Sequence, residues 1–390
     1  MWRHIASNAL TFFVVLLFLA AGLVTWGTGR YTEAGPLAGA ICLQVDRGSN
    51  MRGVSEELVE LGAITSPAIF RMGADYSAKT AQLKAGSFLV PEQASMAEIV
   101  DIVTRGGRNT CGTEVVYRIG VTRTLIDVRE LDPATGAYVE LAGFNPAEDE
   151  PPAAYEEVIG RADTQYRIAL AEGVTSWTIV QALNGLDLLD GDVEEIPREG
   201  SLAPDSYAFA PGDQVADLIA QMSAAQDQIL AEAWAGRDDD LPYGSPEDAL
   251  IMASIIEKET GVTDERRQVA SVFVNRLNRG MRLQTDPTVI YGITRGQGVL
   301  GRGLRRSELR AETPWNTYVI AGMPPTPIAN PGRASIEAAV NPDSTDFIFF
   351  VADGTGGHAF ATNLEDHNRN VAAWREIEAE RAAAAEESSN

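Results

Sequence analysis

Residues 245–261 have the sequence Ser-Pro-Glu-Asp-Ala-Leu-Ile-Met-Ala-Ser-Ile-Ile-Glu-Lys-Glu-Thr-Gly. Serine followed by proline favours a helix start, because the hydroxyl caps free backbone amides and proline fits the first turn. Asp248 adds negative charge near the positive end of the helix dipole. We therefore predict a helix that begins at Pro246 and ends near Gly261.

This predicted helix has an apolar face that ends in a carboxylate. The residues at helical spacing on that face are Met252, Ile255, Ile256 and Glu259. Glu257 lies roughly 160° away around the helix axis. Burial and the negative end of the helix dipole both raise the pKa of a carboxyl at position 259, so Glu259 is a candidate proton donor. The alternative is a structural glutamate that pairs with Lys258 or Arg266.

The composition narrows the possible functions. A chain of 390 residues with 45% hydrophobic content can bury more than one core. Its 31 basic and 55 acidic residues give a net charge of -24, which excludes a nucleic-acid partner. With two cysteines, three histidines and no His-Glu-x-x-His spacing, a zinc site is not indicated, and we expect no metal or organic cofactor.

The N-terminus contains an uncharged segment that is long enough to cross a bilayer. Roughly 25 residues from Ile5 to Gly29 follow Arg3 without a charge. This length favours a retained anchor over a cleaved signal peptide, for which residues 38–40 offer only a weak cleavage site. Because the positive charge precedes the span, we predict a cytoplasmic tip and a single inner (plasma) membrane helix in residues 1–30, with a periplasmic remainder.

The remainder has the pattern of an α+β protein with several parts. Residues 31–110 combine short strands, glycine turns and amphipathic helices, and residues 111–165 are expected to be an inserted β-rich element. Residues 166–210 repeat the order of strand, glycine turn and helix, and they are expected to connect to a mixed α/β domain in residues 211–375. Residues 376–390 lack apolar content, which predicts a disordered tail or a frayed helix.

Cys42 and Cys111 flank the first of these parts. An oxidising compartment permits a bridge between them, which would close a loop of roughly 70 residues and raise stability by up to about 4 kcal/mol. Two unrelated buried thiols are the alternative. We favour the bridge.

Several motifs carry a resemblance to a known family. The strongest are Ile-Glu-Lys-Glu-Thr at 256–260, Val-Phe-Val-Asn-Arg-Leu at 272–277 and Met-Arg-Leu-Gln-Thr-Asp-Pro-Thr-Val-Ile-Tyr-Gly at 281–292. Further matching segments are residues 172–173, 199–200, 204–207, 312–318, 322–325, 330–332 and 350–353. Together they closely resemble the endolytic transglycosylase family of bacterial cell-wall enzymes, over most of the chain from about Ile41.

The resemblance implies a fold and an activity. It implies a LysM-like module in residues 31–110 and a catalytic domain in which Glu259 is the acid. It also implies endolytic cleavage of the bonds between N-acetylmuramic acid and N-acetylglucosamine in peptidoglycan, which leaves 1,6-anhydro ends. Cuts made close to a membrane anchor would fall in nascent strands and terminate chain elongation. Two alternatives stay open: a hydrolytic muramidase with Asp286 as second carboxylate, and a non-catalytic, membrane-anchored peptidoglycan-binding scaffold. His358 is predicted to be structural, because a transglycosylase needs no imidazole.

Two polar segments are candidates for binding sugar. Gln284, Thr285 and Asp286 precede a proline, and Asn316 and Tyr318 offer an amide and a phenol to sugar hydroxyls. Each segment has an ordinary alternative, because such residues also bond their own backbone in turns or lie on plain surface. The resemblance strengthens the binding interpretation.

Residues 30–40 are predicted to be a short tether between the anchor and the module. Fully extended, such a segment reaches at most roughly 40 Å. The active site would then remain near the membrane, where new glycan strands emerge. The predicted partners are therefore peptidoglycan strands and the glycan synthases, including penicillin-binding proteins.

Overall fold

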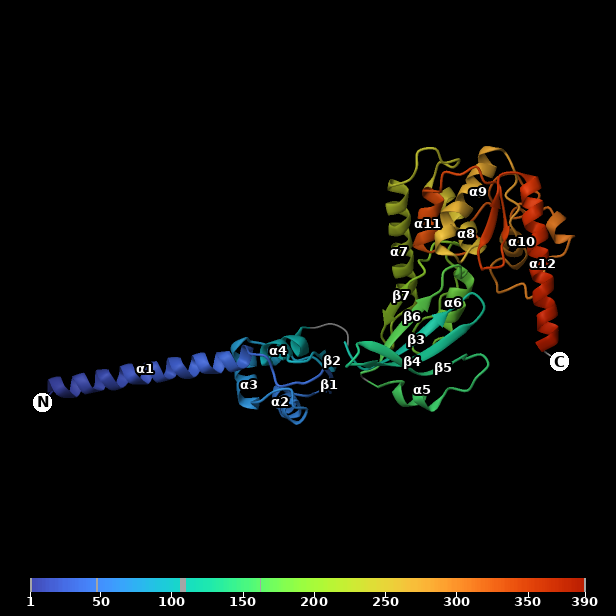
Figure 1. The fold of residues 1–390 in the computed structure, drawn as a ribbon. Helices are drawn as coiled ribbons and strands as arrows, with labels where there is room; N and C mark the ends of the chain where they lie inside the picture. The colour runs from blue at the N-terminus through green and yellow to red at the C-terminus, as the bar shows by residue number, and fades with distance from the viewer. Residues whose placement is uncertain (1, 47, 106–109, 162, 389–390) are drawn as a thin grey trace. The chain divides into compact units, whose positions relative to one another are not determined.

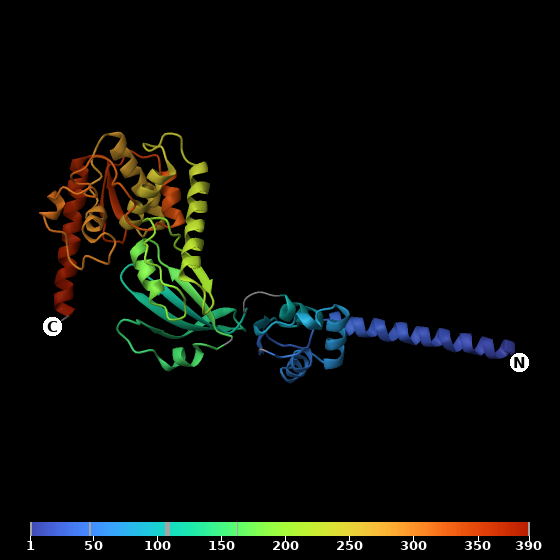
Figure 2. The same cartoon turned by 180° about the vertical axis from the view of Figure 1, so that it is seen from behind.

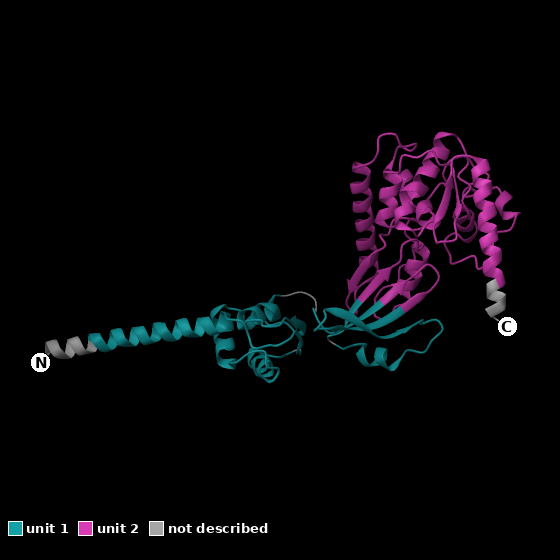
Figure 3. Ribbon diagram, viewed as in Figure 1, with its two compact units in different colours: residues 1–116, 126–166 teal, residues 117–125, 167–390 magenta. Residues whose placement is uncertain are grey.

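The computed structural model describes residues 2–46, 48–105, 110–161 and 163–388. The chain divides into two compact units, one of residues 1–116 with 126–166 and one of residues 117–125 with 167–390 (Figure 3). Each unit is considered by itself below.

The first unit begins with a long apolar helix, α1 (Trp2–Thr32) (Figure 1). Its segment Leu10–Thr32 has 23 residues and a mean hydropathy of 2.2, and none of that window is buried. By length and composition this helix can cross a membrane, as the anchor predicted for residues 1–30 requires.

A small α+β module follows α1. Its elements are β1 (Ile41–Val45), α2 (Met51–Glu60), α3 (Pro67–Tyr76), the short 3₁₀ helix η1 (Thr80–Gln82), β2 (Gly86–Val90) and α4 (Met96–Thr104). The two strands pair antiparallel, with Ile41 opposite Val90. The Ser95 side chain caps α4 and Glu98 returns the bond, as a capping box. The helices pack on a core that includes Leu43, Leu58 and Phe70.

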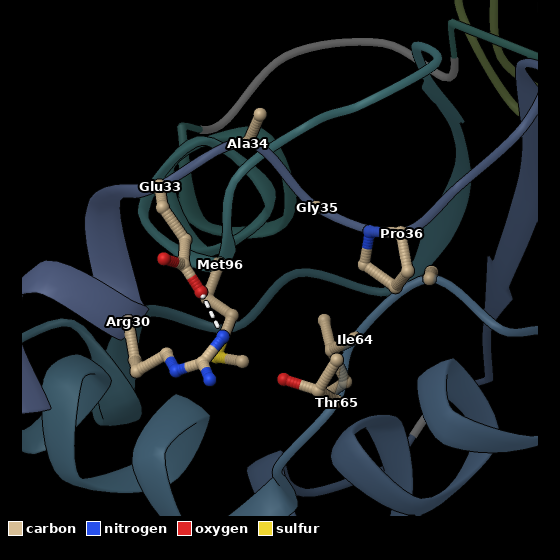
Figure 4. Close-up of a pocket in the computed structure, with 9 residues that line it drawn as sticks. Arg30, Glu33, Ala34, Gly35, Pro36, Ile64, Thr65 and Met96 are labelled. Atoms are coloured by element: carbon tan, nitrogen blue, oxygen red, sulfur yellow. Dashed lines mark hydrogen bonds and ion pairs between the residues drawn. The ribbon is translucent and has the colours of Figure 1, made fainter.

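Residues 33–40 do not form the free tether that the sequence predicts. The backbone amide of Gly35 donates to the carbonyl of Gln93 at 2.9 Å, and the amide of Gln93 donates to the carbonyl of Leu37 at 3.0 Å. Leu37 is buried in the core of the module. Figure 4 shows this junction, where Arg30 and Glu33 form an ion pair beside a hollow of about 230 Å³. The anchor helix therefore runs directly into the module.

A five-stranded sheet has the strand order β5-β4-β3-β6-β7. These strands are β3 (Thr113–Ile119), β4 (Thr124–Asp132), β5 (Ala137–Phe144), β6 (Gln165–Leu170) and β7 (Ser206–Phe209), and the helices between them are α5 (Ala153–Val158) and α6 (Ser176–Asn184). The β-rich character predicted for residues 111–165 is present in β3, β4 and β5. Because β3 pairs with β6, the boundary predicted near residue 165 falls inside one sheet.

The rest of the second unit is mostly helical (Figures 1 and 2). Its elements are α7 (Val215–Ala235), α8 (Pro246–Glu259), η2 (Thr263–Glu265), α9 (Arg266–Asn278), α10 (Asp286–Thr294), η3 (Glu308–Arg310), α11 (Arg333–Val340), β8 (Phe349–Ala352), β9 (His358–Ala361) and α12 (Leu364–Ser388). Helix α8 lies at its centre and packs against α7, α9, α10 and α11. Every residue of α8 from 249 to 256 is buried.

The C-terminal segment is helical where the sequence predicts a disordered tail or a frayed helix. Helix α12 continues to Ser388, although residues 376–390 contain little apolar surface to bury. Alanine and glutamate are strong helix formers, which supports the helix without a core. Arg381 also donates to the carbonyl of Gly354.

Candidate active site

Helix α8 starts and ends where its capping residues predict. The Ser245 side chain accepts a bond from the backbone amide of Asp248 at 3.1 Å, and Pro246 occupies the first turn. The helix ends at Glu259, and Thr260 has extended backbone. Glu259 therefore lies in the last turn, where the helix dipole is negative.

Glu259 lies among polar side chains from several segments. The Thr285 hydroxyl donates to its Oε1 atom. Among the described residues, none is hydrogen-bonded to Oε2, which leaves that oxygen free to meet a substrate. Burial raises the pKa of Glu259 and the charge of Asp286 adds to the rise, while the Thr285 bond and the charges of His358 and Arg276 oppose it. The net rise in pKa favours the protonated form, which a proton donor needs.

Glu257 lies in a different environment, as the helix geometry predicts. Its Oε2 atom accepts the backbone amide of Gly332 at 3.0 Å, and its Oε1 atom is 3.9 Å from the Arg266 guanidinium. Arg266 also contacts Glu172 at 3.3 Å. The Glu257 side chain is only 6% exposed, so it is a buried structural group and not a surface residue.

The loop that carries Gln284, Thr285 and Asp286 leads into α10. Gln284 is exposed and has a φ of 54°, which is strained for a residue with a side chain. The Thr285 amide donates to the Thr317 hydroxyl at 3.0 Å, and the Thr288 hydroxyl donates to the Thr285 carbonyl at 2.8 Å. These bonds fix the Thr285 side chain against Glu259.

Asp286 and Tyr318 are brought together. The Tyr318 hydroxyl donates to Oδ1 of Asp286 at 2.7 Å. Burial raises the pKa of Tyr318, and its bond to Asp286 raises it further, so the phenol keeps its proton. The pair therefore presents one carboxylate and one phenol beside Glu259.

Asn316 does not offer its amide to a ligand. It is fully buried, and its amide nitrogen donates to the carbonyls of Glu308 and Ala311 at 3.1 and 2.7 Å. Its oxygen accepts the backbone amide of Tyr318 at 3.0 Å. This geometry favours a role in shaping the loop that holds Tyr318 over direct contact with sugar.

Sequence reasoning did not single out Arg276, which is buried on α9. Its Nε atom donates to the carbonyl of Ile348 at 2.7 Å, and one terminal nitrogen donates to the carbonyl of Leu283 at 2.5 Å. The guanidinium joins three segments around Glu259. A single arginine within the apolar run 272–277 is the signal that could have identified it.

His358 is held by Glu265. Its Nδ1 atom is 2.8 Å from Oε2 of Glu265, and its backbone amide donates to Oε1 at 3.0 Å. The ring lies edge-on to Phe350. These contacts fit the structural role that the sequence predicts, but the charge of His358 also reaches Glu259.

Two hollows share part of their lining, and the first of them lies beside α8 and α10. The first has a volume of about 370 Å³ and is lined in part by Lys258, Pro287 and Tyr291. The second has a volume of about 390 Å³ and shares Val121, Thr178, Gly298 and Val299 with the first. Lys258 and Pro287 are the sequence neighbours of Glu259 and Asp286.

We expect Thr285→Val to move the alkaline limb of the activity profile to higher pH. The hydroxyl bond holds the pKa of Glu259 down, so its loss raises that pKa and keeps the acid protonated to higher pH. The measurement is the pH dependence of kcat/KM on soluble glycan fragments. Thr288→Val is the comparison variant: its hydroxyl bonds Thr285 and Thr317 and not Glu259, so it acts on Glu259 only through Thr285 and should shift the profile less. An equal shift in both variants would contradict this assignment.

Comparisons with known proteins agree with the motifs. Residues 43–373 match the YceG-like family. An endolytic murein transglycosylase of Streptococcus pneumoniae serotype 2 (strain D39) is 27% identical over 389 residues, which cover 95% of this chain and 65% of that protein. One of Bacillus subtilis (strain 168) is 38% identical over 173 residues, covering 44% of this chain and 47% of that protein.

The chain thus spans less than two thirds of the length of these curated relatives. A crystal structure of a YceG-like protein from Listeria monocytogenes is 24% identical. That match covers 85% of this chain and 98% of the other, with a TM-score of 0.43.

Proposed function

The chain belongs to the YceG-like family, and on this premise we propose that it is an endolytic lytic transglycosylase of peptidoglycan. Its substrate is the bond between N-acetylmuramic acid and N-acetylglucosamine. The single observation that carries the proposal is Glu259, a carboxyl with a raised pKa at the end of a buried helix. The name of the relatives, endolytic murein transglycosylase, supports it.

One carboxyl group can perform both proton transfers of this reaction. Protonated Glu259 gives its proton to the bridging oxygen, and the bond from that oxygen to C1 of N-acetylmuramic acid breaks. The Glu259 carboxylate then takes the proton of the 6-hydroxyl on the same sugar. Oxygen 6 bonds to C1 and closes the 1,6-anhydro ring. No water is consumed, and Glu259 ends protonated.

The surrounding residues assist these two transfers in the proposed mechanism. Burial keeps Glu259 protonated before cleavage, and the Thr285 hydroxyl stabilises the carboxylate once the proton has left. The Asp286 carboxylate faces the positive charge that develops on the sugar ring in the transition state. Gln284 is exposed next to them and is available to sugar hydroxyls.

A hydrolytic muramidase is the second candidate, because Asp286 supplies a second carboxylate near Glu259. In that reaction Asp286 would activate water or attack C1 itself. A non-catalytic scaffold is the third candidate, and the raised pKa of Glu259 argues against it.

The test is a digest of purified sacculi by the full chain in detergent, in water enriched in heavy oxygen. A transglycosylase yields 1,6-anhydro ends without the label, as mass spectrometry would show. Reducing ends that carry heavy oxygen would assign the hydrolase, and uncut strands would assign the scaffold.

The proposal extends to the arrangement of the chain. The order β1-α2-α3-β2 with antiparallel strands supports a LysM-like module in residues 31–110, which would bind glycan. Helix α1 would anchor the chain in the inner (plasma) membrane with Arg3 on the cytoplasmic side, so that residues 111–375 work in the periplasm. Peptidoglycan synthases, penicillin-binding proteins among them, are then the proposed partners, because cuts made near the membrane terminate nascent strands.

A further inference from the structure

Helix α1 packs against α3 at its C-terminal end. The ring of Tyr31 lies over Gly73, and a Cβ built on Gly73 would be 2.2 Å from that ring. Only glycine at this position lets the two helices approach so closely. The chain after α1 is also bonded to the loop at Gln93, so two sets of contacts join the end of α1 to the module.

The packing places α3 at the level of the lipid headgroups if α1 crosses the bilayer. Trp26 is the last large apolar side chain before Tyr31, and tryptophan is enriched at the bilayer edge. Tyr31 follows five residues later, about 7.5 Å along the helix. The headgroup layer on each side is roughly 5–7 Å thick.

The outer face of α3 carries a stripe of uncharged side chains, with the exposed Asp75 at its edge, where the carboxylate accepts a bond from the Thr80 hydroxyl. Ala68, Met72 and Tyr76 recur every four residues and are all exposed, while Phe70 and Ala74 point into the core. Met72 is 62% exposed and Tyr76 is 95% exposed. That exposure of Tyr76 is the highest among the large hydrophobic side chains that the structure describes. Figures 1 and 2 show α3 at the end of the module that joins α1, with β1 and β2 at the opposite end.

We propose that the α3 stripe of Ala68, Met72 and Tyr76 rests in the interfacial layer of the bilayer that α1 crosses. This inference rests on the proposed anchoring. The occupant is lipid and not a protein, because α3 packs against the membrane-spanning helix and lies at the end of the module from which that helix leaves (Figures 1 and 2). Tyrosine suits this layer, since its ring prefers apolar surroundings and its hydroxyl prefers water. The bilayer then fixes the tilt of the module as well as its distance.

The test uses spin labels on the full chain in phosphatidylcholine vesicles. The chain has two cysteines, which form one disulfide, so an introduced cysteine is the sole free thiol. Nitroxide is attached at Tyr76→Cys or Ala68→Cys, and at Gln44→Cys on β1 as the matched control. We expect collisions with a water-soluble nickel chelate to be lost at positions 68 and 76 and kept at position 44. Collisions with oxygen should rise at 68 and 76.

A label at Leu17→Cys separates this inference from the anchoring on which it rests. If the nitroxide at position 17 is protected from the chelate and the nitroxide at position 76 is fully accessible to it, the inference is overturned and the anchor still stands. Chelate access at position 17 would overturn both. Spin–spin broadening at position 76 that disappears on dilution with unlabelled chain, together with chelate protection that disappears on dilution with lipid, would assign the stripe to a second copy and overturn the lipid proposal.

A charged variant supplies a second measurement. Met72→Glu with Tyr76→Glu places two carboxylates on exposed positions, so the fold should persist. Ionised carboxylates avoid the bilayer, and we expect chelate access at a label on position 68 to return in this variant. Continued protection of position 68 would contradict contact with lipid.

Discussion

Glu259→Gln is expected to abolish glycan cleavage while the fold remains intact. The amide keeps the shape of the side chain but has no proton to transfer. A positioned general acid is worth about 10² to 10⁴ in rate. In the proposed mechanism Glu259 acts as acid and then as base, so the loss should reach about 10³-fold or more. The measurement is the release of anhydro-ended fragments from sacculi.

The same substitution should not lower stability at neutral pH. Burial raises the pKa of Glu259 in the folded state, so ionisation there costs folding free energy. The stability that the wild-type acid contributes is complete below its unfolded pKa and is lost as the pH rises through the folded pKa. Glutamine does not titrate. The difference in Tm, variant minus wild type, should therefore increase as the pH rises from the unfolded pKa of Glu259 through its folded pKa.

Glu257→Gln is the matched control on the same helix. Its carboxylate bonds the Gly332 amide and faces Arg266, so the change should weaken packing and lower Tm slightly while most activity is kept. A greater loss of cleavage from Glu257→Gln than from Glu259→Gln would contradict the assignment of the acid.

The local sequence was sufficient to predict helix α8 and the separation of its two glutamates. Capping at Ser245 and the spacing of apolar residues depend only on neighbours in the chain, which is why Glu259 and Glu257 could be placed on different faces. The burial of Glu257 could not be predicted in this way. It depends on Arg266 and Gly332, which reach it from other segments.

Contacts between distant segments explain the rest of the site. Arg276 bonds carbonyls in two other segments, and no periodicity in the sequence indicates such partners. The motif at 330–332 holds distant segments together on the Glu257 side of α8. The Asn330 amide donates to the carbonyl of Val174 at 2.9 Å, and a Cβ on Gly332 would lie 1.7 Å from the Glu172 carboxyl. The resemblance thus rests partly on residues that hold α8 against its neighbours and not on residues around Glu259.

The junction after α1 shows a second limit of sequence reasoning. Residues 33–40 contain glycines and a proline, which favour a loop. A loop that follows a membrane span suggests a free tether. The structure has the loop, but Leu37 enters the core and Gly35 bonds the turn at Gln93. A single apolar residue in a loop does not reveal which core it will join.

Removal of the disulfide is expected to have the largest effect on stability. Cys42 and Cys111 are bonded in the structure, with their Cα atoms 5.6 Å apart and 69 residues apart in sequence. Closing a loop of this length restricts the unfolded chain by about 4 kcal/mol. Cys42→Ser with Cys111→Ser should therefore lower the free energy of unfolding of the small module by about that amount.

The urea midpoint of the module, measured with and without reductant, checks this expectation. The urea midpoint of the double serine variant should equal that of reduced wild type and should not respond to reductant. At a temperature where the variant is folded, its turnover should equal that of wild type, because the bridge joins β1 to the segment before β3 and includes no residue of the proposed site. The Cys111 amide also bonds the carbonyl of Ser87 at 3.3 Å, so local contact persists without the bridge and the loss reports mainly on chain entropy. Two reactive thiols on denatured, unreduced protein would show instead that the pair is open in the mature chain.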